Sequence, residues 1–219
     1  MSVLKWDETG KRLYETGVKK GVLYVQDETG KYGTGVAWNG LTAVTESPSG
    51  AEATPLYADD IKYLNLMSVE EFGATIEAYT YPEEFEVCNG YAEAASGVYI
   101  GQQPRKTFGF SYVTTIGSDT KGTKHGYKLH IVYGALASPS DKAYATVNDS
   151  PEAITFSWEV TTTPVTVANF EPTASLTIDS TKCDAEKLKA LEAKLYGSES
   201  EEPTLPLPDE IFALIGTAA

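Results

Sequence analysis

Residues 117–124 come closest, in this sequence, to a nucleotide-binding motif. Their sequence, GSDTKGTK, resembles the phosphate-binding pattern G-x-x-x-x-G-K-[ST]. The last two residues stand in the wrong order, however. The residues that follow alternate as in a strand, so no helix would offer its N-terminus to a phosphate. We therefore interpret residues 117–124 as the tip of a β-hairpin, built of residues that tolerate turns.

The side chains that most readily bind transition metals are also poorly placed. His125 and His130 are the only histidines, Cys88 and Cys183 the only cysteines, and their spacing matches no zinc-binding pattern. We expect no cofactor. Because the cysteines lie far apart and the N-terminus lacks an apolar signal region, we expect free thiols in a protein made in a reducing cytoplasm. No apolar run is long enough to span a bilayer, so no membrane contact is expected.

The carboxylates are numerous, but their spacing singles out no pair. The chain has 31 Asp and Glu against 17 Lys and Arg, which gives a formal charge of −14. Two such acids could serve a glycoside hydrolase as acid and base, and a solvated acidic surface explains them equally well. The charge also disfavours wrapping of nucleic acid, which needs a basic surface. It does not oppose nucleic acid that passes without binding.

Alternating apolar and polar residues predict that strands dominate the chain. Four stretches, 69–81, 105–116, 124–133 and 153–163, place bulky apolar residues on one face and small, hydroxylated or acidic residues on the other. The content of 14 Tyr against two Met also favours a β-rich core. We expect residues 105–133 to form a long hairpin with one apolar face, whose other face can line water.

The remaining segments predict how this sheet is completed. A helix should begin near Thr181 and Asp184, bury Leu188, Leu191 and Leu195, and end at Gly197. Residues 1–197 then form one domain, and residues 198–219 form an acidic linker and a C-terminal arm, in which a short helix can begin at Pro208. Residues 40–60, rich in small residues and proline, are expected to be a long exposed loop.

Five segments of the chain resemble the major tail proteins, or tail tube proteins, of bacteriophages with long non-contractile tails. These segments are residues 15–24, 38–42, 77–85, 127–133 and 205–210. The resemblance covers most of the chain and lies in overall pattern, not in a catalytic motif. It implies a mainly β protein with a β-sandwich tail-tube fold, one flanking α-helix, a long loop and a C-terminal arm.

The resemblance also implies a structural function without enzymatic activity. Such proteins form hexameric rings that stack into the tube of the virion tail. The tube surrounds a tape measure protein, joins other tail proteins and later conducts DNA into the host, in whose bacterial cytoplasm the protein is made. In this family a long loop and the terminal arms join successive rings, which here implies that role for residues 40–60 and for the C-terminal arm, residues 205–219.

Carried over to this sequence, the resemblance predicts two sets of site residues. Acids on the lumen wall would repel phosphates and let DNA slide, and the candidates are Glu71, Glu77 and Glu159. Contacts between rings are expected from a basic patch and from the 40–60 loop: Lys121, Lys124, Lys128, Glu46, Pro48 and Glu52. For every one of these residues the alternative is an ordinary solvated position on the outer surface.

Three other functions remain open from the sequence. The chain could be a different virion β-sandwich, such as a head decoration or receptor-binding protein, which would display an exposed aromatic patch or a sugar pocket. A carboxylate-based glycoside hydrolase would need a deep cleft with paired acids. A headless phage-like particle could use the same tube.

Overall fold

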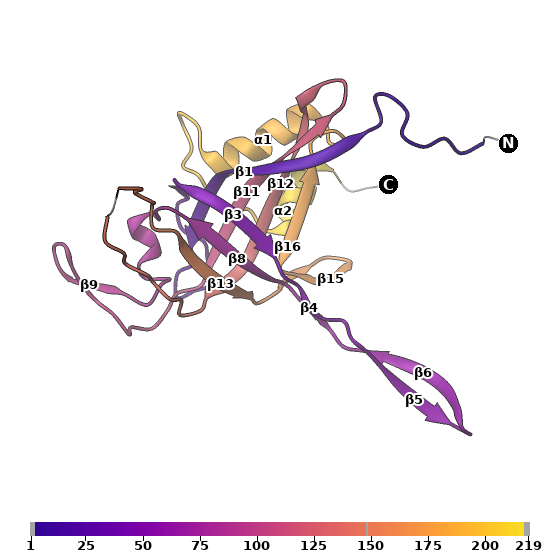
Figure 1. Ribbon diagram of the computed structural model, residues 1–219, viewed down its shortest axis with the longest axis horizontal. Helices are drawn as coiled ribbons and strands as arrows, with labels where there is room; N and C mark the ends of the chain where they lie inside the picture. The colour runs from indigo at the N-terminus through magenta and orange to yellow at the C-terminus, as the bar shows by residue number, and fades with distance from the viewer. Residues whose placement is uncertain (1–2, 148, 217–219) are drawn as a thin grey trace.

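The protein folds mainly as antiparallel β-structure, as predicted (Figure 1). The computed structural model describes residues 3–147 and 149–216. The strands are β1 Leu13–Val25, β2 Val36–Trp38, β3 Leu41–Glu46, β4 Ser49–Gly50, β5 Ala53–Ala58, β6 Ile61–Met67, β7 Glu70–Glu71, β8 Gly73–Ala78, β9 Ala92–Ala95, β10 Val98–Ile100, β11 Phe108–Ser118, β12 Gly122–Ala137, β13 Phe156–Thr162, β14 Val165–Val167, β15 Phe170–Thr173 and β16 Ser175–Asp179. The helices are the 3-10 turn η1 Glu83–Phe85, α1 Ala185–Tyr196 and α2 Pro208–Ile215.

One eight-stranded sheet supplies both layers of a β-sandwich. Its strand order is β2-β1-β11-β12-β13-β8-β3, and β16 pairs with β12 as a branch. Strands β2 and β3 follow one another in the chain, separated only by residues 39–40, yet they stand at opposite ends of this order. The sheet must therefore curl back on itself, which brings β3 against β1.

Gly134 lies where strand β12 passes from one layer to the other. Residues before it pair with β16, from Lys128 to Val132, and residues after it pair with β13, from Ala135 to Ala137. Gly134 has a φ of 57°, and a Cβ at this position would stand 2.2 Å from the carbonyl oxygen of Thr163. Only glycine fits this left-handed, closely approached corner without strain.

Two apolar cores lie on the two faces of the central strands. The first fills the sandwich and centres on aromatic side chains, with Trp158 5.1 Å from Phe85 and 5.6 Å from Trp38 between ring centroids. The second lies between the sheet and the helices, where Leu191 and Leu195 of α1 pack on Leu129 and the neighbouring strand residues. The central strands are thus covered on both sides.

The pairing of β11 with β12 contradicts the expected single apolar face of this hairpin. The hairpin exists, but Phe110 pairs with Val132 and faces the first core, whereas Ile131 pairs with Ser111 and faces the second. Phe110 and Tyr112 of β11 therefore point toward the first core, whereas Leu129 and Ile131 of β12 point toward the second. Even the small residue Ser111 is fully buried, so this part of the sheet does not line water.

The C-terminal helices cover the outer side of the second core. Helix α1 matches its predicted range: the Asp184 side chain accepts hydrogen bonds from the backbone N–H groups of Glu186 and Lys187, and Gly197 ends the helix at a φ of 81°. A second helix, α2, begins at Pro208 as the sequence allowed. Because the Tyr133 hydroxyl donates to the Pro206 carbonyl at 2.9 Å, the segment before α2 is fixed to the sheet.

The expectation of a long loop at 40–60 is wrong. Residues 41–46 form β3, an edge strand of the main sheet, and Val44 packs against the first core. Residues 49–71 form a two-stranded arm, built from β4–β7 and β5–β6, which projects far from the sandwich (Figure 1). We call residues 49–71 the arm.

Candidate functional site

The loop that resembled a phosphate-binding motif is a hairpin tip, as predicted. Strand β11 ends at Ser118 and β12 begins at Gly122, so a strand follows the turn and no helix does. The Asp119 carboxylate accepts hydrogen bonds from the Gly10 backbone N–H at 3.0 and 3.1 Å. The tip therefore carries a carboxylate and fixes the N-terminal segment, an arrangement unsuited to a phosphate.

In the described part of the chain there is no metal site, and Cys88 is poorly suited to thiol chemistry. Within residues 3–147 and 149–216, no group of three His, Cys, Asp or Glu side chains could hold a metal ion. Both cysteines are free, and Cys88 is buried. Burial raises the pKa of the Cys88 thiol to about 12, so the reactive thiolate is strongly disfavoured.

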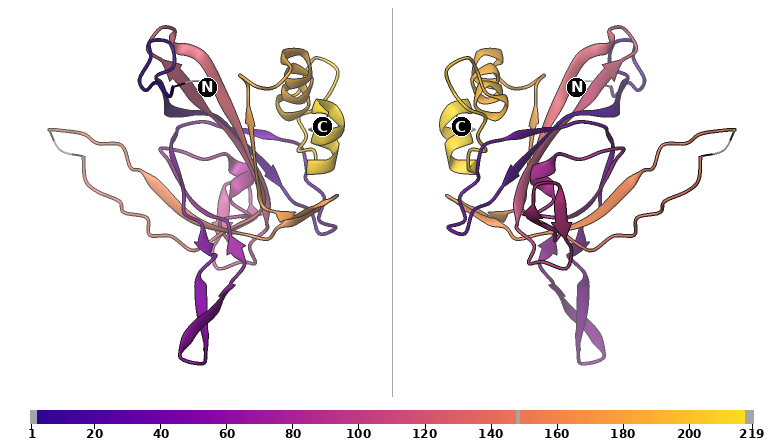
Figure 2. Two further views of the ribbon diagram at one scale, coloured as in Figure 1. Left: turned by 90° about the vertical axis from the view of Figure 1, so that its right-hand side faces the viewer. Right: turned by 90° about the vertical axis from the view of Figure 1, so that its left-hand side faces the viewer.

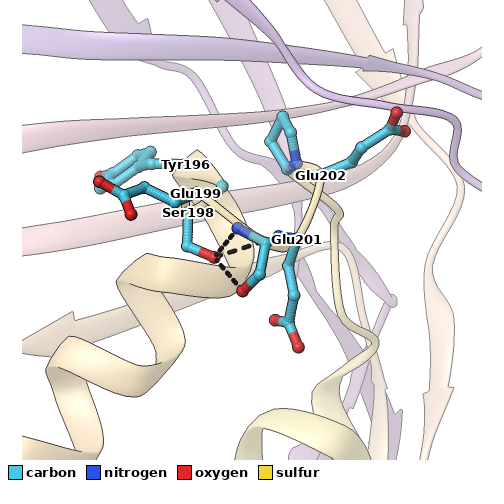
Figure 3. A pocket seen from close by; sticks show the side chains of 8 residues that line it. Tyr196, Ser198, Glu199, Glu201 and Glu202 are labelled. Atoms are coloured by element: carbon cyan, nitrogen blue, oxygen red, sulfur yellow. Dashed lines mark hydrogen bonds between the residues drawn. The ribbon is translucent and has the colours of Figure 1, made fainter.

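The acidic linker between α1 and α2 also lacks the convergence that catalysis needs. Its residues bound a shallow hollow on the surface, and Ser198 closes the turn by accepting hydrogen bonds from the backbone N–H groups of Ser200 and Glu201 (Figure 3). The side chains of Glu199, Glu201 and Glu202 point in three different directions (Figure 3). They do not form the paired acids that a glycoside hydrolase requires.

A partly buried polar cluster surrounds His130, where β3 ends. The His130 ring stacks on Tyr112 with centroids 4.6 Å apart, and its Nε2 lies 2.9 Å from the Thr114 hydroxyl. Its Nδ1 lies 3.5 Å from the Glu46 carboxylate, which also accepts a 2.6 Å hydrogen bond from the Tyr112 hydroxyl. Burial lowers the pKa of His130, although Glu46 and Glu15 oppose this effect, so the ring is neutral near pH 7.

The polar groups of this cluster bond to one another, so the cluster stabilises the fold. Thr177 also approaches Nδ1 of His130 at 3.4 Å, and Lys128 nearby forms an ion pair with Glu15. Each ring nitrogen of His130 therefore has a polar neighbour within the chain. The cluster joins β3, and hence the root of the arm, to strands β11, β12 and β16.

Two of the three predicted lumen acids lie on one face of neighbouring strands. Glu77 of β8 pairs with Ser157, and Glu159 of β13 pairs with Thr75, two residues farther along the same strands. Because both side chains have the parity opposite to buried Ile76 and Trp158, they point away from the first core. Glu71 lies elsewhere, in β7 at the root of the arm, where it pairs with Ser49.

The predicted basic patch divides into two parts. Lys121 and Lys124 are exposed at the tip of the β11–β12 hairpin, at or beside its turn. Lys128 lies farther along β12, and its ammonium group is paired with the Glu15 carboxylate. The pKa of Lys128 is raised, chiefly by its hydrogen bond with Glu15. Of the three lysines, Lys121 and Lys124 are therefore the ones whose ammonium groups have no ion-pair partner within the described residues.

The arm is the feature that the sequence reasoning missed. Glu46 and Pro48 precede the arm, and Glu52 lies between β4 and β5. The three predicted contact residues therefore lie near the end of the arm that joins the sandwich. Its large apolar side chains are solvent-exposed: Leu56, Tyr57, Ile61, Tyr63, Leu64, Leu66, Met67 and Val69. The pairings Thr54–Leu66 and Leu56–Leu64 gather three leucines on one face. The apolar alternation on both sides of Asp59 and Asp60 was the sequence signal for it.

Comparison with known proteins identifies no family. The sequence matches no protein-family model and no curated protein. A chain of the extended PVC sheath-tube complex of an extracellular contractile injection system is similar over 73% of this chain and 88% of its own, at 12% identity and a TM-score of 0.32. A score this low does not establish a common fold. In the described part of the chain, no helix is long and apolar enough to cross a membrane.

Proposed function

We propose that this chain is a structural virion protein that forms the tail tube of a long-tailed, non-contractile bacteriophage. Hexameric rings of the protein stack into a tube around a tape measure protein and join the other tail proteins. After assembly the tube conducts DNA into the host without binding it. The protein is made in the bacterial cytoplasm, functions in the virion tail and has no catalytic role.

The apolar arm is the observation that carries this proposal. A two-stranded hairpin alone is at best marginally stable in water, and this one projects from the domain with its large side chains exposed. Exposed apolar surface of this kind marks a contact site with another protein. A second copy is the partner we propose, because a stacked tube repeats one such contact at every subunit.

The acidic face of β8 and β13 supports the proposed passage of DNA through the tube. We assign Glu71, Glu77 and Glu159 to the lumen, where carboxylates repel the DNA phosphates and so prevent binding. Around Glu77 and Glu159, this face carries small and hydroxylated residues such as Thr75 and Ser157. Small side chains make a smooth wall for a sliding polymer.

We assign the ring-to-ring contacts to the arm and to the tip of the β11–β12 hairpin. The predicted contact residues are Lys121, Lys124 and Lys128 together with Glu46, Pro48 and Glu52. Lysines at the tip would pair with acids of the next ring and fix the register between rings. The burial of the arm's leucines would supply most of the free energy of stacking.

Shortening the arm tests the proposal. The Ser68 backbone N–H donates to the Glu52 carbonyl at 3.2 Å, and the Glu52 N–H donates to the Ser68 hydroxyl at 3.0 Å, so the two residues already face each other. Replacing residues 53–67 by Asn-Gly joins them through a two-residue turn. No residue of 53–67 belongs to either core, so the subunit should keep its melting temperature.

The parent protein at high concentration should form hollow tubes or six-fold rings in negative-stain electron microscopy, and the shortened variant should remain monomeric. The matched control, Val98→Thr with Ile100→Thr, removes apolar surface from a different exposed hairpin and should still form tubes. Normal tubes from the shortened variant would refute the role of the arm. A compact closed oligomer of the parent would instead favour a head decoration protein.

A further inference from the structure

Lys142 lies in an aromatic cage that the proposed tube function does not use. Its ammonium nitrogen is 4.8 Å from the ring centroid of Tyr91, 5.4 Å from that of Tyr81 and 5.8 Å from that of Phe156. The Lys142 ammonium also donates to the Tyr81 hydroxyl at 3.3 Å. Three rings around one cation form the arrangement by which proteins recognise alkylammonium groups.

A carboxylate completes the cage. The Tyr81 hydroxyl donates to Oε1 of Glu86 at 3.1 Å, and Oε2 of Glu86 is buried without a hydrogen-bond partner in the described structure. Burial lowers the pKa of Lys142, but its hydrogen bond to Tyr81 and the nearby acidic groups more than compensate, so its pKa is raised. The cage therefore favours a cation.

The cage anchors one end of a long connection. Lys142 belongs to the connection between β12 and β13, whose described residues, 138–147 and 149–155, reach far from the sandwich (Figure 2). A cavity of about 630 Å³ opens beside the cage and is lined by Tyr91, Lys142, Gln103 and Arg105, among others. A chain that carries a second ammonium group could approach the rings through this cavity. The Gln103 amide and the Arg105 guanidinium already donate to the carbonyl groups of Gly101 and Ala137, each at 3.1 Å, so they form a fixed polar wall of the cavity.

We propose that this cage is an exchangeable binding site for an alkylammonium group. Lys142 is its occupant within the subunit, and a lysine side chain or another alkylammonium group on an incoming chain displaces it. Displacement releases the base of the β12–β13 connection. Because Lys142 is tethered, it competes at an effective concentration in the millimolar range, so the site is weak until the competitor is itself held nearby. This inference does not depend on the tube.

Emptying the cage tests the proposal directly. Lys142→Ala should bind tetramethylammonium saturably, seen as an upfield ring-current shift of its methyl resonance by NMR, with sodium chloride at equal ionic strength as the reference. The parent should bind at least about tenfold more weakly, since Lys142 must first leave. Adding Tyr91→Ala to Lys142→Ala should abolish binding. Lys189→Ala, an exposed change of equal charge in α1, should behave as the parent.

A second measurement needs no variant. Saturating tetramethylammonium should accelerate limited proteolysis of the parent within residues 143–147, because the displaced Lys142 no longer holds the residues that follow it. Absence of this acceleration would overturn the exchange, even if Lys142→Ala failed to fold. Equal binding by the parent and Lys142→Ala, or binding that survives Tyr91→Ala, would overturn the site itself. Either result would show that Lys142 is a permanent, stabilising occupant of the cage.

Discussion

Replacing Ile211 by alanine should destabilise the isolated subunit by about 2–4 kcal/mol. Ile211 of α2 is 1% exposed and belongs to the core formed by the sheet and α1. The change removes three carbon atoms, worth about 0.8 kcal/mol each in transfer from water, and leaves a cavity that adds to the cost. This prediction tests whether α2 packs on its own chain or is left free to contact another ring.

Urea unfolding followed by circular dichroism measures this effect. Leu207→Ala is the matched control, because Leu207 precedes the same helix but is 46% exposed, and it should cost less than about 1 kcal/mol. The midpoint should fall for Ile211→Ala at an unchanged slope. A loss below about 0.5 kcal/mol would show that α2 contributes little to the subunit. The C-terminal segment would then be available to form contacts between rings.

Three further predictions concern single features of the fold. The pKa of His130 is lowered in the folded protein, so the unfolded chain binds more protons below about pH 6.5. The free energy of unfolding should therefore fall as the pH drops below that value. In urea unfolding from pH 5 to 8, His130→Gln should flatten this dependence. Gly134→Ala should cost at least about 2 kcal/mol, because the new Cβ meets the Thr163 carbonyl at a left-handed φ, and an unchanged melting temperature would contradict the tight corner. The double substitution Glu77→Lys with Glu159→Lys reverses both charges and should preserve folding but impair genome delivery. Unchanged infectivity would contradict the proposed position of these residues in the lumen.

The strands were predictable because each carries its own alternation. Trp158 and Val160 face inward in β13, and Ala74, Ile76 and Ala78 do so in β8, as the period of two requires. Helix α1 was predictable for the same local reason, from its leucine spacing and its Asp184 and Gly197 ends.

The faces of the central hairpin were not predictable from either strand alone. The pattern of β11 shows that Phe110 and Tyr112 share a face, and the pattern of β12 shows that Leu129 and Ile131 share one. Whether these faces coincide depends on the pairing register, which a shift of one residue reverses. Only the observed pairing shows that the hairpin separates two cores.

The candidate site was predictable only in part, for a related reason. Parity alone put Glu77 and Glu159 opposite the apolar residues of their own strands. Their shared face follows from the pairing of β8 with β13, two strands far apart in sequence. The cage around Lys142 had no local signal at all, because its rings come from three separate segments.

The position of β3 determines how the acidic face would continue in an assembly. Among the described strands, β3 pairs only with β8 and stands at one end of the main sheet's strand order. A neighbouring subunit that paired with β3 would extend the face that carries Glu77, and six such joins would close the main sheets into a ring. Six subunits would bring a formal charge of roughly −84, six times −14, to one ring. Carboxylates repeated around the bore at each subunit would leave DNA no cationic site at which to stop, so edge pairing along β3 and passage of DNA depend on the same sheet.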